Sequence, residues 1–269
     1  MPNLMSHLLP SSVSMPLAGL LAACGTPANP ALDSAGAATL ARLQQAAESA
    51  GALIYQGAVF ALPPHGGAPL FHYERRIQAA ADTLLATHLT REASGEVVVS
   101  EAARFTPDYQ LQRFEAAHKH GGYSGSVVVT GGRHLRYTLN RGGEVSSATE
   151  DVSDPVVAGP SLHGFILTHW EALAAGQTIR VRMIVLAKKE SYAFTIRRAE
   201  AGPGRTAFSI TPASLLVRLA VDPLRVEFDT TSRHVLRYQG RVPPLQRENG
   251  KLKTLDADVA YTQHAANYR

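Results

Sequence analysis

Residues 156–176 have the sequence VVAGPSLHGFILTHWEALAAG, the clearest helical pattern in the last two-thirds of the chain. Pro160 suits the start of a helix, and Gly176 suits the position just past its end. The apolar side chains between them recur at helical spacing and form one stripe: Leu162, Phe165, Ile166, Trp170 and Leu173. We therefore predict one central helix here, against which the rest of the chain packs.

Outside this stretch the apolar residues mostly alternate with polar ones, the pattern of a half-buried strand. Glycine pairs at about ten-residue spacing separate the alternating segments, which indicates an antiparallel meander. Each predicted strand has one apolar face and one face rich in Arg and Thr, so we expect a sheet with one buried and one wet face. Clear examples are residues 71–77, 135–139, 179–185, 192–196 and 215–221.

The fold class that follows is mainly β (α+β). We expect a large curved antiparallel sheet, or an open half-barrel, packed around the central helix. Asp33 or Ser34 suits the cap of a short N-terminal helix that ends at Gly51. Its apolar face is mostly alanine, so its packing should be shallow. No linker divides residues 34–269, which we predict to be a single β-rich domain.

The start of the chain resembles the targeting segment of bacterial lipoproteins. Leu21-Ala22-Ala23-Cys24 follows an apolar run and is similar to the lipobox, in which the cysteine is lipidated and becomes the mature N-terminus. The resemblance implies a signal peptide at residues 1–23 and a lipidated N-terminus and tether at residues 24–33. It also implies a membrane anchor at Cys24, and the Gly that follows favours the periplasmic face of the outer membrane. No Lys or Arg precedes the apolar run, a departure from the usual signal peptide. The alternative is a free, buried cysteine.

Composition limits the classes of function. The net charge is +4, and the chain has no block of Lys or Arg, so nucleic acid is not an expected partner. A single cysteine forms neither an internal disulfide nor a cysteine metal cluster. The glycine pairs match neither a phosphate-binding loop nor a dinucleotide fingerprint, and we predict no cofactor.

Three segments of the C-terminal half resemble a group of uncharacterised bacterial envelope proteins. They are DPLRVEFD (222–229), RHVLRYQGRVPP (233–244) and the GPSLHGFILTHWEALAAGQ run of the central helix. In that group a strand ends in Tyr-x-Gly before a polar turn. The chain also resembles, more distantly, the periplasmic lipoprotein carriers, in which a curved antiparallel sheet wraps a helix. The resemblance covers roughly residues 73–261 and carries over no catalytic residues.

Two histidines of the central helix are candidate pocket residues. His169 lies in the apolar stripe, where it is either a satisfied buried residue or a ligand contact that responds to pH. His163 borders the stripe near Trp170 and lies either at a pocket mouth or at a helix edge that closes over the sheet. A metal site is a weaker hypothesis. His118 and His120 would share a strand face and could bind a metal together with His88 or His72, but no third ligand is set by spacing.

Our leading hypothesis is a non-catalytic, lipid-anchored envelope protein that binds an acyl chain or another apolar envelope component. A single helix about 10 Å across cannot cover a sheet of many strands spaced about 4.8 Å apart, so space remains for a ligand. The alternatives are a small-molecule hydrolase or isomerase that uses a pocket histidine, and a structural or assembly protein of the envelope. The predicted ligand contacts are His163, His169, Trp170, Met183, Tyr192, Phe194 and Phe228.

Overall fold

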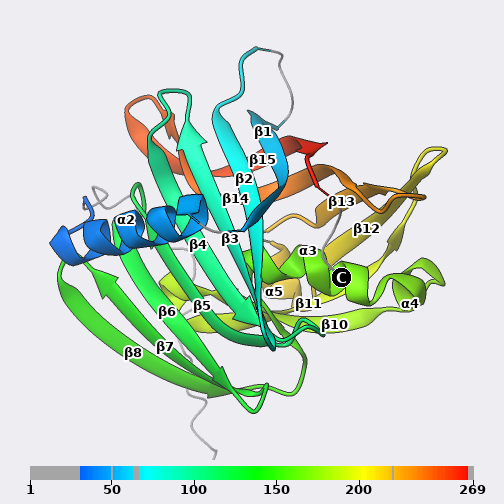
Figure 1. Ribbon diagram of the computed structural model, residues 1–269, viewed down its shortest axis with the longest axis horizontal. Coiled ribbons are helices and arrows are strands. Elements are labelled where there is room, and N and C mark those ends of the chain that lie inside the picture. Colours follow the sequence, from blue (N-terminus) through cyan, green and yellow to red (C-terminus); the bar gives the residue numbers. More distant parts are fainter. Residues whose placement is uncertain (1–30, 50, 63–66, 220, 266–269) are drawn as a thin grey trace, which may run out of the picture.

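The computed structural model describes residues 31–49, 51–62, 67–219 and 221–265. Within them fifteen strands form one sheet, in the order β8-β7-β6-β5-β4-β3-β2-β1-β15-β14-β13-β12-β11-β10-β9 (Figure 1). The first half of the chain supplies β1 (Ala52–Ala61), β2 (Phe71–Ala80), β3 (Thr83–Glu92), β4 (Val97–Phe105), β5 (Leu111–His118), β6 (Tyr123–Thr130), β7 (His134–Arg141) and β8 (Glu144–Asp151). The second half supplies β9 (Val156–Val157), β10 (Ile179–Val185), β11 (Glu190–Ala199), β12 (Arg205–Pro212), β13 (Leu224–Asp229), β14 (Val235–Glu248) and β15 (Lys251–Gln263).

The predicted fold class is confirmed. All neighbouring strands are antiparallel except β9 and β10, which are parallel. Two meanders, β1 to β8 and β10 to β15, join where β1 pairs with β15. The sheet curls so that its two arms, β1 to β8 and β9 to β15, face each other without closing into a barrel (Figure 1). An ion pair crosses between the arms, from Arg182 Nη2 on β10 to Glu150 Oε2 on β8 at 3.5 Å.

The central helix lies between the arms, but it is interrupted (Figure 1). Residues 156–176 form β9, then α3 (Gly159–Thr168), then α4 (Trp170–Ala174), with a break at His169. The prediction of one continuous helix over this stretch was therefore wrong. The stripe itself is confirmed, because Phe165, Ile166, Trp170 and Leu173 are all buried in the main core. Gly176 follows the last turn with a φ of +92°, as a C-terminal glycine does.

The N-terminal helix α2 (Ser34–Ser49) covers the opposite, outer face of the sheet. Asp33 caps it, as expected, because its Oδ1 accepts a hydrogen bond from the Gly36 backbone N–H at 2.8 Å. Leu43 packs on Ala102 of β4 and Ala117 of β5, where small side chains let the helix approach closely.

Strands β3 and β4 are buried on both faces, which differs from the expected alternation of buried and wet faces. The first seven residues of β4 and most residues of β3 are buried. The reason is that α2 covers these strands from outside while α3 covers them from inside (Figure 1).

The strand predicted over residues 215–221 was wrong. Leu215–Arg218 form the short helix α5, and Leu215, Leu216 and Leu219 are exposed. The strand that precedes α5 in the chain is β12, and it buries Phe208 and Ile210.

The Tyr-x-Gly sequence does not end a strand in this chain. Tyr238-Gln239-Gly240 lies inside β14, and pairing with β15 continues past an irregularity between Val242 and Leu245. Gly240 has a φ of +135°, and a Cβ there would lie 2.6 Å from Leu224 Cδ2. The glycine thus permits a bend and a close approach to β13.

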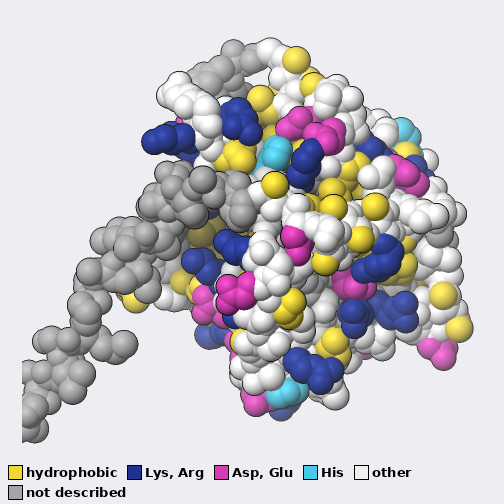
Figure 2. Space-filling model, turned by 90° about the vertical axis from the view of Figure 1, so that its left-hand side faces the viewer, with side chains coloured by type: hydrophobic (Ala, Val, Ile, Leu, Met, Phe, Trp, Pro, Cys, Tyr) yellow, Lys and Arg dark blue, Asp and Glu magenta, His cyan; other side chains and the backbone are white. Residues whose placement is uncertain are grey.

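Several predictions lie outside the described residues, namely the signal peptide at 1–23, Cys24 and most of the tether. Among the helices that the structure describes, none has the length and apolar character needed to cross a membrane. On the face of the molecule seen in Figure 2, basic and acidic side chains are interspersed, so no patch of one sign covers that face.

Candidate functional site

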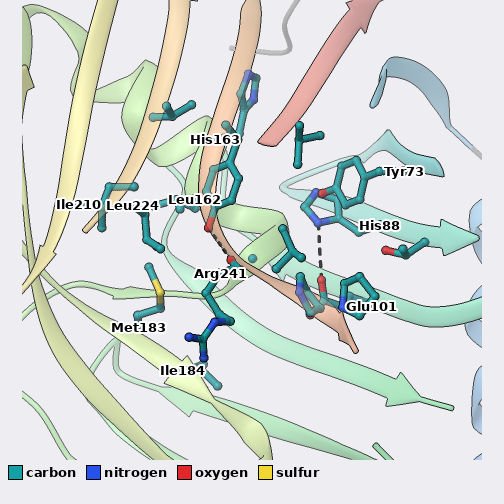
Figure 3. A pocket seen from close by; sticks show the side chains of 18 of the residues that line it. Tyr73, His88, Glu101, Leu162, His163, Met183, Ile184, Ile210, Leu224 and Arg241 are labelled. Atoms are coloured by element: carbon teal, nitrogen blue, oxygen red, sulfur yellow. Dashed lines mark hydrogen bonds and ion pairs between the residues drawn. The ribbon is translucent and has the colours of Figure 1, made fainter. Parts of the chain in front are cut away.

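A cavity of about 440 Å³ lies between the inner face of the sheet and α3. Both arms line it, mostly with apolar side chains, and Leu162, His163 and Ile166 of α3 form one wall (Figure 3). On the β14 side the lining includes the half-buried Arg241 and the exposed Pro243, so the cavity reaches the surface there. Arg241 is held by Asp256, with Nε and Oδ1 2.8 Å apart.

One end of the cavity is polar. His88 of β3, Glu101 of β4 and His118 of β5 face inward from neighbouring strands and are all buried. The His88 Nδ1 lies 3.6 Å from Glu101 Oε2, and the His118 Nε2 lies 3.9 Å from Glu101 Oε1 (Figure 3). Burial raises the pKa of Glu101 to about 7 and lowers the pKa of His118 to about 3. Both changes follow from the cost of placing a charge away from water.

Behind this end lies Arg75 of β2, which is fully buried. Its Nη1 donates hydrogen bonds to the Pro160 carbonyl of α3 and to His88 Nε2, the latter at 2.8 Å. Its Nε and Nη2 have no hydrogen-bond partner among the described residues. Burial, and then the charge of Arg75, hold the pKa of His88 well below its usual value, so this imidazole is neutral.

Aromatic rings surround the polar end. The ring of Tyr55 lies 4.9 Å from that of Tyr261, 5.3 Å from His163 and 6.2 Å from Tyr73. The Tyr73 ring lies 4.8 Å from the ring of His88. Burial raises the pKa of each of these tyrosines, so the phenols stay uncharged and offer O–H groups.

The structure separates the two candidate histidines. His163 lines the cavity and is 9 % exposed, and its Nε2 has no partner among the described residues. Burial lowers the pKa of His163 well below its usual value. His169 lies at the break between α3 and α4, away from the cavity lining. Its Nδ1 donates to the Phe165 carbonyl at 2.9 Å, and its ring stacks on Phe165.

Of the other predicted ligand contacts, some line the cavity and some do not. Met183 and Phe194 line the cavity. Trp170 and Phe228 do not, because they pack with Phe208 into a cluster with ring centroids 5.3 to 5.9 Å apart. Tyr192 also lies outside the lining, and its hydroxyl donates to Glu190.

In the part of the chain that the structure describes, no group of three or more ligating side chains is placed to hold a metal ion. His118 and His120 do not share a strand face, since β5 ends at His118. His120 instead pairs with Glu92, its Nε2 3.1 Å from Oε1, while His118 stacks on Tyr123.

Sequence reasoning missed Arg75, Glu101 and Tyr73. A signal for Glu101 was present, because period-two alternation in VVVSEAARF puts it on the same face as Val99 and Ala103. A carboxyl in the apolar row of a strand is uncommon unless it is paired or functional. No comparable signal shows that side chains from β2, β3, β4 and α3 converge.

No protein-family model matches the chain, and no curated protein matches it. Among solved structures, a porin-like protein from Bacteroides uniformis is 8% identical, with 79% of this chain and 98% of that chain covered and a TM-score of 0.22. An acyl-CoA thioesterase II, TesB2, from Mycobacterium marinum is 10% identical, with coverage of 87% and 89% and a TM-score of 0.15. A putative thioesterase II from Thermobifida fusca is 9% identical, with 90% of each chain covered and a TM-score of 0.14. TM-scores this low do not establish a shared fold.

Proposed function

We propose that the protein binds an amphiphile whose apolar tail lies in the cavity between the sheet and α3. The observation that carries the proposal is the cavity itself, which is lined by apolar side chains of both arms and reaches the surface beside Pro243. Its volume of about 440 Å³ falls within the range of about 300–1,000 Å³ typical of small-molecule sites. An acyl chain fits such a lining.

The cavity is distinct from the densely packed core beside it. Trp170, Phe208 and Phe228 meet edge to face and are buried, so this part of the space between the arms is filled by the chain's own rings. The cavity lies beside this aromatic cluster and is lined there by Met183 and by branched aliphatic side chains such as Ile210 and Leu224 (Figure 3). Methionine adapts its shape readily, which suits contact with a flexible chain.

A matched pair of variants at Met183 tests binding. Met183→Trp fills the cavity and should abolish saturable binding of a fluorescent fatty acid, whereas Met183→Leu conserves the volume and should retain it. Circular dichroism of both variants verifies that the fold is kept. Equal binding by the folded Trp variant and the wild type, or no saturable binding by the wild type, contradicts the proposal.

The proposal includes an envelope location, with the chain anchored at the periplasmic face of the outer membrane through a lipid on Cys24. The sequence of residues 13–25 supports this part of the proposal. Cys24→Ser should leave an unprocessed precursor, and mass spectrometry of wild-type protein extracted from membranes should find an acylated Cys24. Normal cleavage and acylation of the Ser variant contradicts the anchor.

A second candidate function is acid–base catalysis in the same cavity. Glu101 favours it, because it lines the cavity and has a pKa of about 7, which suits a group that accepts and returns a proton at neutral pH. His163, with its free Nε2, lies in the same lining. Turnover of acyl esters that is lost in Glu101→Gln while ligand binding persists would establish an enzyme; binding without turnover of any ester favours the binding protein.

A further inference from the structure

The two ends of the cavity differ in chemistry (Figure 3). Met183 of β10 and Ile210 of β12 lie at one end, and Tyr73, His88 and Glu101 of β2, β3 and β4 lie at the other. A tail among the aliphatic side chains therefore places its head group beside Glu101. The chemistry of this polar end determines which head group it accepts.

Glu101 is a carboxyl group without a hydrogen bond among the described residues. It is 6 % exposed, and the ring nitrogens of His88 at 3.6 Å and His118 at 3.9 Å lie beyond hydrogen-bonding distance. The missing Cβ of Gly159, at the start of α3, leaves room beside the carboxyl, since a Cβ there would lie 3.2 Å from Glu101 Oε2. A buried polar group in this state needs a partner, and the cavity is the open side.

Neither imidazole supplies a counter-charge for Glu101. Arg75 Nη1 lies 2.8 Å from His88 Nε2, and a guanidinium has no acceptor, so Nε2 accepts and the proton of His88 resides on Nδ1. This imidazole is neutral, as is that of His118, whose pKa burial lowers to about 3. His163 on α3 is neutral for the same reason.

Arg75, which contacts this end of the cavity through His88, is the uncompensated charge there. Tyr73 of β2 and Tyr123 of β6 stay uncharged, because burial raises their pKa values. Arg241 of β14 is paired with Asp256. Arg75 is fully buried, and no described carboxylate lies within ion-pair distance of it. A buried cation without a counter-ion is costly, so the polar end favours one negative charge.

We propose that the ligand is a long-chain carboxylic acid whose head group shares one proton with Glu101. This inference rests on the proposed function and names its ligand class. The O–H of one carboxyl donates to an oxygen of the other, so the pair carries a single negative charge that opposes the charge of Arg75. An amine head group would instead add a second cation near Arg75, and an alcohol would supply no charge.

Binding of the carboxylate therefore takes up a proton wherever unliganded Glu101 is ionised. Since burial sets the pKa of Glu101 to about 7, the affinity for the acid should weaken about tenfold for each pH unit above that value. At lower pH, Glu101 already holds the proton, and the affinity should change little.

The test compares a fluorescent polyene fatty acid with the alcohol of the same chain, both titrated into the full-length protein at about pH 6, 7 and 8. The wild type should bind the acid about tenfold more weakly at pH 8 than at pH 6, with about a fivefold loss between pH 7 and pH 8, and should bind the alcohol with one affinity throughout. Glu101→Gln cannot exchange the proton and should bind the acid independently of pH. Glu115→Gln is the matched control on the neighbouring strand and should keep the wild-type profile.

The outcomes separate this inference from the function on which it rests. Saturable binding of both probes with the same pH profile overturns the assignment of the head group but leaves the apolar site standing. A wild-type pH profile in Glu101→Gln overturns the role of Glu101. Absence of saturable binding by either probe at every pH contradicts the proposed function itself.

Discussion

At the scale of single residues, burial is the property that distinguishes the polar end of the cavity. Arg75 of β2 and Glu101 of β4 lie on strands that flank β3, and both side chains are buried, so neither can use water to screen its charge. The ionisation state of Glu101 is therefore tied to the stability of the fold.

The pH dependence of unfolding tests the environment of Glu101. Burial raises its folded pKa from 4.5 to about 7, so between these values the folded state holds a proton that the unfolded state has lost. The stabilisation from protonated Glu101 is complete below pH 4.5 and is lost as pH rises through 7, by up to about 3 kcal/mol. Glu101→Gln removes this loss.

The measurement is the difference in unfolding free energy between Glu101→Gln and the wild type, from denaturant melts at about pH 5 and pH 8. The buried histidines, whose folded pKa values are lowered, oppose the trend in both proteins and cancel in this difference. The variant should gain relative to the wild type at the higher pH. An unchanged difference would show that Glu101 is solvated.

Gly240 is a position where both the backbone conformation and the close packing disfavour any residue other than glycine. Its φ of +135° disfavours any side chain, and a Cβ would meet Leu224 at 2.6 Å. Gly240→Ala should destabilise the protein by about 2 kcal/mol or more. Gly131→Ala is the control, since Gly131 has a φ of +58° with open space around it and should cost only about 1 kcal/mol. Equal costs in thermal or denaturant melts would refute the close contact.

At the scale of elements, the stripe of the central helix was predictable from sequence and its interruption was not. Helical spacing placed Phe165 and Leu173 in the core correctly, because the turn of helix α4 keeps nearly the same face inward after the break. The break at His169 directly precedes Trp170, which packs on Phe208 and Phe228, residues distant in the chain.

The apolar stripe of the interrupted central helix predicts which substitutions destabilise the protein. Phe165 is 4 % exposed, so Phe165→Ala should cost about 3–5 kcal/mol. Glu171 projects the other way, with its side chain 82 % exposed and paired with Arg233 at 2.6 Å, and an exposed pair of this kind contributes little. Glu171→Ala should therefore stay within about 0.5 kcal/mol of the wild type. Denaturant midpoints that coincide for the two variants would contradict the assigned faces.

The errors at this scale have a common cause. Residues 215–221 alternate as a strand does, yet their spacing also suits a helical turn, and a short apolar run does not decide between the two periods. The faces of β3 and β4 were misjudged for a related reason. Only tertiary packing shows that α2 lies over Ala102 and Ala117.

At the scale of the whole molecule, the sequence was sufficient for a curved antiparallel sheet around a helix, because strand period and glycine turns are local properties. The candidate site was not predictable in the same way. Arg75 reaches the Pro160 carbonyl across 85 positions of sequence, and four different elements supply the polar end. Met183, Phe194 and His163 line the cavity, whereas Trp170, Tyr192, Phe228 and His169 lie outside the lining. Sequence does not separate the two groups, since large side chains fill a core as readily as they line a cavity.

The most direct test of the central claim is a crystal structure of the protein with a fatty acid that carries bromine at the end of its tail. Anomalous scattering locates the bromine without reference to the protein phases. We predict a bromine peak between α3 and strands β10 to β13, near Met183 and Ile210, with the carboxyl beside Glu101. A bromine peak elsewhere on a protein saturated with the acid, or the reverse orientation with bromine beside Glu101, would contradict it.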